Sequence, residues 1–241
     1  MNENVNIIQV RISVFVSENI GYEPGIAGKY NALLMPSGQI CQAFPSPNGQ
    51  MLLNPNPSIP WGTTWGLQDE ATRIVFLPGK IDFIKDILAK NDNSSLQEFT
   101  DLCLTWIERI SENIRECGRE LLFTRLALAP LYGLSESDNG FKVWDRVFNP
   151  HLYEVDALAD RNVTYLYKRI LELNDRKINV NLLHNIFDGK RFDPEKTEDA
   201  TLISFDINTV PHPSLYYTAE EIRDFYMYAL SASDELLNNL V

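Results

Sequence analysis

The 241-residue chain is expected to adopt an α+β fold, in which helices cover one face of a mostly antiparallel sheet. Two long helices are recognisable from their apolar stripes, at 96–117 and at the C-terminus. Each helix follows a group of β-branched segments with alternating polarity. The apolar share of 44% is too high for a disordered chain, and no apolar run approaches the roughly 18 residues of a membrane helix.

The order of these elements divides the chain into two similar halves, 1–118 and 119–241. Each half opens with a long strand, continues through an irregular insertion and further strands, and ends with one amphipathic helix of about twenty residues. We expect the two halves to form one compact unit.

The first half opens with a strand over 5–16, where Val10, Ile12, Val14 and Val16 share one face. Six prolines between positions 36 and 60 make long central strands improbable, so 36–66 is interpreted as an ordered loop or lid with short strands at 32–35 and 39–44. A strand over 72–77 precedes a Pro78-Gly79 turn. The segment that follows fits either a returning strand at 80–83 or a helix. Ser95 and Glu98 then form a capping box for the helix that Gly118 ends.

The second half begins with a strand over 120–131 and a helical turn or two over 141–148. The segments 163–173 and 177–187 are separated by Asn-Asp-Arg, which is typical of a hairpin connection. Another strand covers 201–210. Thr218 and Glu221 form a second capping box, and Tyr216-Tyr217 before it is interpreted as a hydrophobic staple.

The net charge and the absence of a targeting pattern indicate which partners and which cellular compartment to expect. The 33 acidic residues outnumber the 21 Lys and Arg, for a net charge of -12. Such a chain repels phosphate backbones, so direct nucleic-acid binding is not expected and a basic or neutral partner is favoured. The N-terminus lacks the basic and apolar regions of a signal peptide, and the cysteines form no disulfide or metal pattern. We therefore expect a reduced, cytoplasmic protein without membrane segments.

The residue types that carry chemistry are scattered. His151, His184 and His212 lie in three separate segments without ligand spacing, so no metal site is predicted. Cys103 and Cys117 fall on the helical stripe and are expected in the core, which leaves Cys41 as the plausible reactive thiol. No phosphate-binding loop or nucleophile elbow is present, and we predict neither a cofactor nor catalytic residues.

Asp206 lies within an apolar strand, where an unpaired buried carboxylate is costly. It is expected to face solvent together with Ser204 and Asn208. A buried pair with Arg125 and a catalytic role are the alternatives.

The most distinctive segment is 55–66, which combines proline with tryptophan. Pro57, Pro60, Trp61 and Trp65 form rigid apolar groups that lose little entropy on binding, so they are candidate anchors for a partner or a ligand ring. The alternative is structural, with both tryptophans sealing one end of the sheet.

Three short segments carry a resemblance to a known family: FLPGKI at 76–81, TRLAL at 124–128 and SFDIN at 204–208. With the order of elements, they resemble a sporadically distributed, functionally uncharacterised family of prokaryotic proteins of similar length. The resemblance implies no established activity. Its sporadic distribution implies genes associated with mobile elements or antiviral defence.

These observations favour a non-catalytic, acidic protein-binding subunit or regulator. The first alternative is a small-molecule-binding domain with 55–66 as a lid over a pocket. A hydrolase or nucleic-acid-processing enzyme is the least favoured, since no nucleophile–base spacing, metal cluster or basic groove is found.

Overall fold

A computed structural model describes most of the strands and helices of the chain. The described residues are 5–17, 42–44, 63–66, 72–77, 79–87, 95–135, 141–148, 161–192, 197–212 and 214–241. The short strand predicted at 32–35 and most of the segment 36–62 lie outside these residues.

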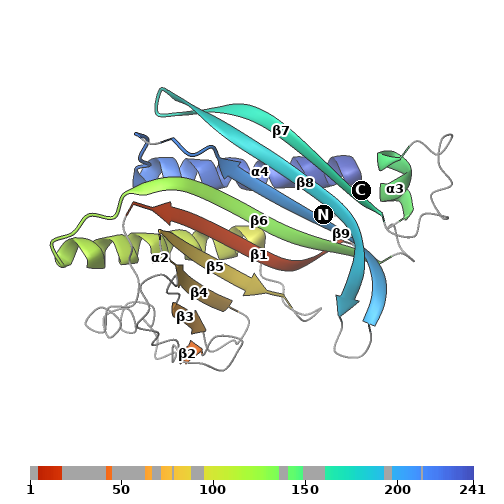
Figure 1. Cartoon of the computed structure of the whole chain (residues 1–241), viewed down its shortest axis with the longest axis horizontal. Helices are drawn as coiled ribbons and strands as arrows, with labels where there is room; N and C mark the ends of the chain where they lie inside the picture. Colours follow the sequence, from red (N-terminus) through yellow and green to blue (C-terminus); the bar gives the residue numbers. More distant parts are fainter. Residues whose placement is uncertain are drawn as a thin grey trace, which may run out of the picture.

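The described strands form one nine-stranded antiparallel sheet in the order β2-β3-β4-β5-β1-β6-β9-β8-β7 (Figure 1). On one side lie β1 (Val5–Val16), β2 (Gln42–Phe44), β3 (Thr63–Gly66), β4 (Thr72–Leu77) and β5 (Lys80–Asp86). The other side holds β6 (Phe123–Ser135), β7 (Asn162–Leu173), β8 (Arg176–Phe192) and β9 (Thr197–Thr209). The strands β1 and β6 pair with each other along the middle of the sheet.

Two long helices, α2 (Leu96–Glu116) and α4 (Ala219–Leu240), lie on the same face of the sheet (Figure 1). Both capping boxes are formed, at Ser95 with Glu98 and at Thr218 with Glu221. A third helix of the described chain, α3 (Phe141–Val147), is short and buries Trp144 completely. The predicted α+β class with an antiparallel sheet is therefore confirmed. None of the described helices is long and apolar enough to span a membrane.

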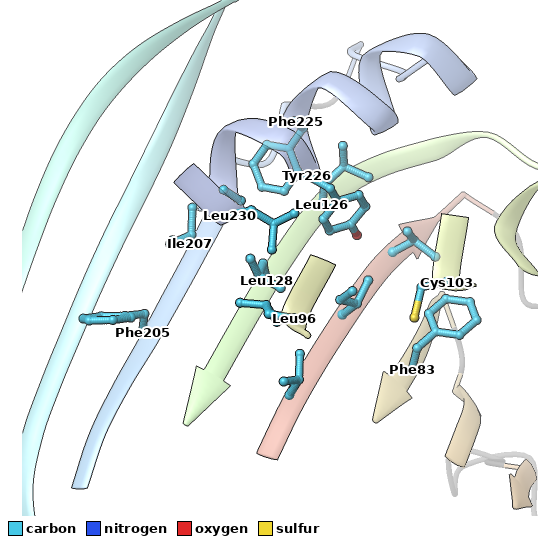
Figure 2. Packing of buried hydrophobic residues seen from close by; sticks show 14 of the residues in the cluster. Phe83, Leu96, Cys103, Leu126, Leu128, Phe205, Ile207, Phe225, Tyr226 and Leu230 are labelled. Atoms are coloured by element: carbon cyan, nitrogen blue, oxygen red, sulfur yellow. The ribbon is translucent and has the colours of Figure 1, made fainter. Parts of the chain in front are cut away.

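The core fills the space between the helices and the sheet. Figure 2 shows Phe225, Tyr226 and Leu230 of α4 beside Leu126 of β6, and Cys103 of α2 beside Phe83 of β5. The predicted stripe of β1 is buried, from Val10 to Val16. The Tyr226 hydroxyl donates to the backbone oxygen of Ser13 over 2.9 Å, which fixes α4 to the middle of the sheet. Burial raises the pKa of this phenol well above its ordinary value.

The structure decides two assignments that periodicity left open or made wrongly. The segment after Gly79 is a strand, β5, because its residues alternate between the helix-covered face and the opposite face. Gly79 has φ +67°, the left-handed conformation that the tight turn between β4 and β5 requires. The residues Thr63–Gly66, expected in a loop, form β3, a four-residue strand that pairs with β2 on one side and with β4 on the other.

The hairpin of β7 and β8 is longer than predicted and turns through two residues. Asn174 and Asp175 have φ of 45° and 63°, the left-handed pair that a two-residue hairpin turn needs. The strand β8 continues to Phe192, and β9 begins at Thr197. Apolar alternation weakens in these extensions, which is why the sequence pattern ended β8 at 187 and began β9 only at 201.

Candidate functional site

The strand β7 is one edge of the sheet and pairs only with β8 among the described residues. Its twelve residues, from Asn162 to Leu173, pair with β8 in one continuous register without a bulge. Figure 1 shows this strand along the upper border of the molecule. One row of its backbone N–H and C=O groups therefore points away from the sheet, where another strand can bind.

Large apolar side chains are exposed on this edge. Leu166 is 56% exposed, Tyr167 is 51% exposed and Ile170 is 67% exposed. The other exposed large apolar residues of the described chain, Leu102, Tyr216 and Met227, lie on or beside the helices. Single exposed apolar residues are normal on protein surfaces, but three within five residues on an edge strand indicate an interaction surface.

The two faces of β7 have different surroundings. Leu166 and Ile170 share the face that no described helix covers, where Leu166 lies opposite Leu183 of β8. Tyr167 lies on the helix side, with its ring 5.1 Å from the ring of His184. The exposed apolar atoms therefore occur on both sides of the strand, as expected where an added strand would bring neighbours to both faces.

Polar contacts fix β7 and its hairpin to α4. Arg169 bonds to Glu235 at 3.3 Å, and this guanidinium lowers the pKa of the Glu235 carboxyl. At the start of β8, Arg176 donates to the buried carboxylate of Glu221 in the first turn of α4. The hairpin is therefore held in place before any partner arrives, which reduces the ordering entropy that binding has to overcome.

The edge carries few of the devices that usually prevent strand addition. Natural edges are short, bulged, or interrupted by proline, whereas β7 is long and regular and contains neither proline nor glycine. Its charged residues are Lys168, Arg169 and Glu172. These charges restrict which strands can pair with β7, but they leave the backbone groups accessible.

A second polar cluster lies at the middle of the helix-free face. The Asp82 carboxylate, which is 5% exposed, accepts from Ser13 Oγ at 2.5 Å and pairs with Lys80 Nζ at 2.9 Å. The Phe15 ring lies between two cations, with Lys80 Nζ at 5.2 Å and the Arg125 guanidinium at 4.8 Å from its centroid. The Asp82–Lys80 pair and the ring contacts of Phe15 connect β1, β5 and β6, so the cluster stabilises the central strands.

A small groove separates α2 from the start of α4. Its volume is about 150 Å³, its floor includes Leu104, Ile107, Phe123 and Ile222, and Glu108 and Glu112 line its rim. Pockets that enclose a drug-sized ligand are about 300–1,000 Å³. This groove is therefore too small to serve as the pocket of a small-molecule-binding domain.

Most of the residues predicted to anchor a partner or ligand lie outside the described part of the chain. Pro57, Pro60 and Trp61 lie outside the described residues, as does the lid interpretation of 55–62. The backbone of Trp65 lies in β3, opposite Ala43 of β2 and Ile74 of β4. The role of these proline and tryptophan residues in binding stays a prediction.

The remaining candidate residues have structural surroundings where they are described. His184 is 5% exposed and packs against Tyr167 and Phe205, and burial followed by the charge of Arg169 lowers its pKa. His212 is exposed and accepts from the Ser214 N–H at 3.3 Å, whereas His151 lies outside the described residues. Within the described part of the chain, no three His, Cys, Asp or Glu residues form a group that could hold a metal ion.

The cysteine prediction is half right. Cys103 is fully buried, and burial raises the pKa of its thiol, as expected of a core residue. Cys117 was expected in the core but is exposed, because the helix ends at Glu116 and Cys117 is its C-cap. Cys41 lies outside the described residues.

Asp206 shares a face with Ser204 and Asn208, as expected, and accepts from Asn208 Nδ2 at 3.0 Å. The expected solvent exposure is met only in part, because Asp206 and Ser204 are half-buried and Asn208 is buried. The side chain of Arg125, the proposed alternative partner, lies over Phe15 instead.

The residues of the β7 edge were missed by sequence reasoning. The segment at 163–173 has apolar residues on both alternating faces, which is also typical of a strand buried in the middle of a sheet. Only the strand order distinguishes an edge strand from a central one. Compared with models of known protein families and with curated proteins, the chain matches none of them.

Proposed function

We propose that this chain is a non-catalytic protein-binding subunit or regulator that docks a partner strand along β7. One observation carries the proposal: a regular twelve-residue edge strand, unpaired on its outer side among the described residues, that exposes Leu166, Tyr167 and Ile170. Strand addition gives affinity through backbone hydrogen bonds and specificity through alternate side chains. Burying the exposed part of each large apolar side chain contributes on the order of 1–2 kcal/mol to binding.

The charge of the partner follows from the contact rather than from the whole chain. The net charge of -12 favours basic or neutral partners at long range. The edge itself presents Lys168, Arg169 and Glu172, so a docked strand needs no excess of positive charge.

The segment with Pro57, Pro60, Trp61 and Trp65 is proposed as a second anchor for the same partner. Its rigid apolar groups suit an interface, although β3 and β7 belong to opposite sides of the strand order. A partner that engages both would span the whole sheet.

We also infer that the chain is built from two similar halves, 1–118 and 119–241. The strand order supports this inference, because β1 and β6 meet in the middle and each is flanked by the last strand of its own half, β5 or β9. Each half then ends in a capped helix, α2 or α4. The cytoplasmic location stays a proposal, which the expectation of reduced cysteines supports, and the defence or mobile-element context rests on the family resemblance alone.

The proposal is tested by capturing partners from native-host extract with the tagged full chain. Ile170→Lys places a charge on the β7 edge, and Leu102→Lys is the matched control on α2, where Leu102 is 43% exposed. A Trp61→Ala/Trp65→Ala variant tests the second anchor, and a synthetic peptide of residues 162–173 tests competition. All variants are first compared in thermal melting.

We expect Ile170→Lys and the competing peptide to remove a partner that the wild type and Leu102→Lys both retain. Equal capture by all variants would show that β7 does not dock the partner. If the tryptophan variant captures normally but melts at a lower temperature, the segment 55–66 has a structural role instead.

A further inference from the structure

We propose that the strand docked on β7 is β7 of a second copy of this chain, in an antiparallel register centred on Ile170. The inference rests on the proposed function of the β7 edge and names its partner. It follows from the order of charges along the strand.

Two identical edge strands related by a twofold axis pair antiparallel, and residues equally distant from the axis face each other. Side chains that face each other must lie on the same side of the sheet, so each allowed register is centred on one residue. The register of β7 with β8 shows which residues share a side: Lys168, Ile170 and Glu172 lie on the helix-free face with Leu166.

The register centred on Ile170 is self-complementary. It places Ile170 against its own copy, and it places Lys168 opposite Glu172 of the second copy at two symmetric positions. Ile170 is the most exposed of the large apolar residues in the described chain, at 67%. Pairing at the axis would therefore bury more apolar surface at Ile170 than at any other of these residues, which favours this register. On the helix side, Tyr167 faces Leu173 of the second copy.

Neighbouring registers are poorer. Centring on Lys168 or Arg169 places each cation against its own copy, which is unfavourable. Centring on Leu166 or Tyr167 leaves Ile170 opposite Asn162 or Thr164 and provides no opposite-charge pair. Charge therefore selects one register from those that the exposed edge permits.

Among the described residues, Glu172 has one competing partner within the same chain. Lys177 of β8 lies 3.8 Å from it, and both side chains are more than 70% exposed. An exposed pair at this distance is weak, so Glu172 remains available to Lys168 of the second copy.

The test is the dimer dissociation constant of the full chain by sedimentation equilibrium. Lys168→Glu creates two like-charge contacts, as does Glu172→Lys, and the double variant Lys168→Glu/Glu172→Lys restores both pairs with reversed sign. Arg223→Glu on α4 is the control, since it changes the net charge by the same amount as Lys168→Glu at an exposed position away from β7. Ile170→Lys probes the axis.

We expect each single swap to weaken the dimer on the order of tenfold, and the double swap to return it to near the wild-type value. Arg223→Glu should have little effect, and Ile170→Lys should give a monomer. A monomeric wild type at all accessible concentrations would overturn the proposal, and so would a dimer in which the double swap is no tighter than the single swaps.

These outcomes separate the inference from the proposed function. If the wild type is monomeric but Ile170→Lys loses a different captured protein, β7 docks another partner strand and only the self-association is wrong. If neither a dimer nor β7-dependent capture is found, both proposals fail.

Discussion

The ion pair between Arg176 and Glu221 is predicted to be a main support of the β7–β8 hairpin. Glu221 is 1% exposed, and one of its oxygens accepts from Arg176 Nε at 2.8 Å while the other accepts from the Thr218 N–H at 2.8 Å. One carboxylate therefore completes the cap of α4 and fixes the start of β8. Arg176→Met keeps the apolar stem of the side chain and removes the charge.

The expected loss of stability follows from what Glu221 retains. After the substitution, the carboxylate keeps the Thr218 bond but loses every bond to the guanidinium. A hydrogen bond to a charged group contributes about 1.5–3 kcal/mol, and an uncompensated buried charge costs about 3–5 kcal/mol. Because the Arg176 side chain is 40% exposed, water reaches the carboxylate in the variant. We therefore expect a loss of about 2–3 kcal/mol in the free energy of unfolding.

The measurement is urea unfolding of the wild type, Arg176→Met, Glu221→Gln and the double variant, with thermal melting as a second readout. The single change at Arg176 should lower the melting temperature by about 5–10 °C in a chain of this length. The cycle should give a coupling energy of at least about 1 kcal/mol. Arg223→Met is the control, since its pair with Glu108 is half exposed and is expected to contribute under about 1 kcal/mol. A coupling energy near zero would refute the reasoning.

Three further predictions concern buried groups. The pKa of His184 is lowered in the folded protein, so the unfolded chain binds a proton at this residue first as the pH falls below about 6.5. The free energy of unfolding should therefore fall between pH 6.5 and the lower pKa of the folded state. In His184→Leu, the difference in this free energy between pH 7 and pH 5 should be smaller. An unchanged slope in that variant would contradict the prediction. A maleimide at pH 8 should label Cys117 in the folded protein and spare Cys103, as read by peptide mass spectrometry; equal labelling would mean that the core opens. Trp144→Phe should lower the unfolding free energy by about 2–4 kcal/mol, because it leaves a gap and removes the 2.9 Å bond from the indole N–H to Thr201; a loss below about 0.5 kcal/mol in chemical denaturation would count against this role.

Local signals predicted the elements with strong periodicity. The stripe from Leu96 to Ile114 and the two capping boxes located α2 and α4, because a helix that covers a sheet must display one apolar face. The alternation of Val10 to Val16 located β1 and its buried face. Thr63–Gly66 was missed because a four-residue strand has too few side chains to show a period.

The candidate site could not be predicted in the same way. Leu166 and Ile170 are conspicuous only because β7 is an edge, and being an edge depends on which strands pair across the whole sheet. Cys117 fits the apolar stripe in sequence, yet it is exposed because the helix ends one residue earlier. Residue patterns indicate a local environment. The exposure of the β7 side chains depends on whether another strand pairs with β7, and the exposure of Cys117 depends on where α2 ends.

The exposure of β7 follows from its place in the sheet and from the side on which the helices lie. Both long helices lie on one face, where Arg169 of β7 pairs with Glu235 of α4. Leu166 and Ile170 lie on the opposite face, which no described helix covers, and the outer side of β7 has no partner strand among the described residues. An edge strand in such a sheet can remain polar, or it can present apolar groups to another chain. The strand β7 presents apolar groups, because Leu166, Tyr167 and Ile170 are exposed. Lys168 and Glu172 carry opposite charges on either side of Ile170, so the β7 strand of a second copy is the complementary partner that we propose.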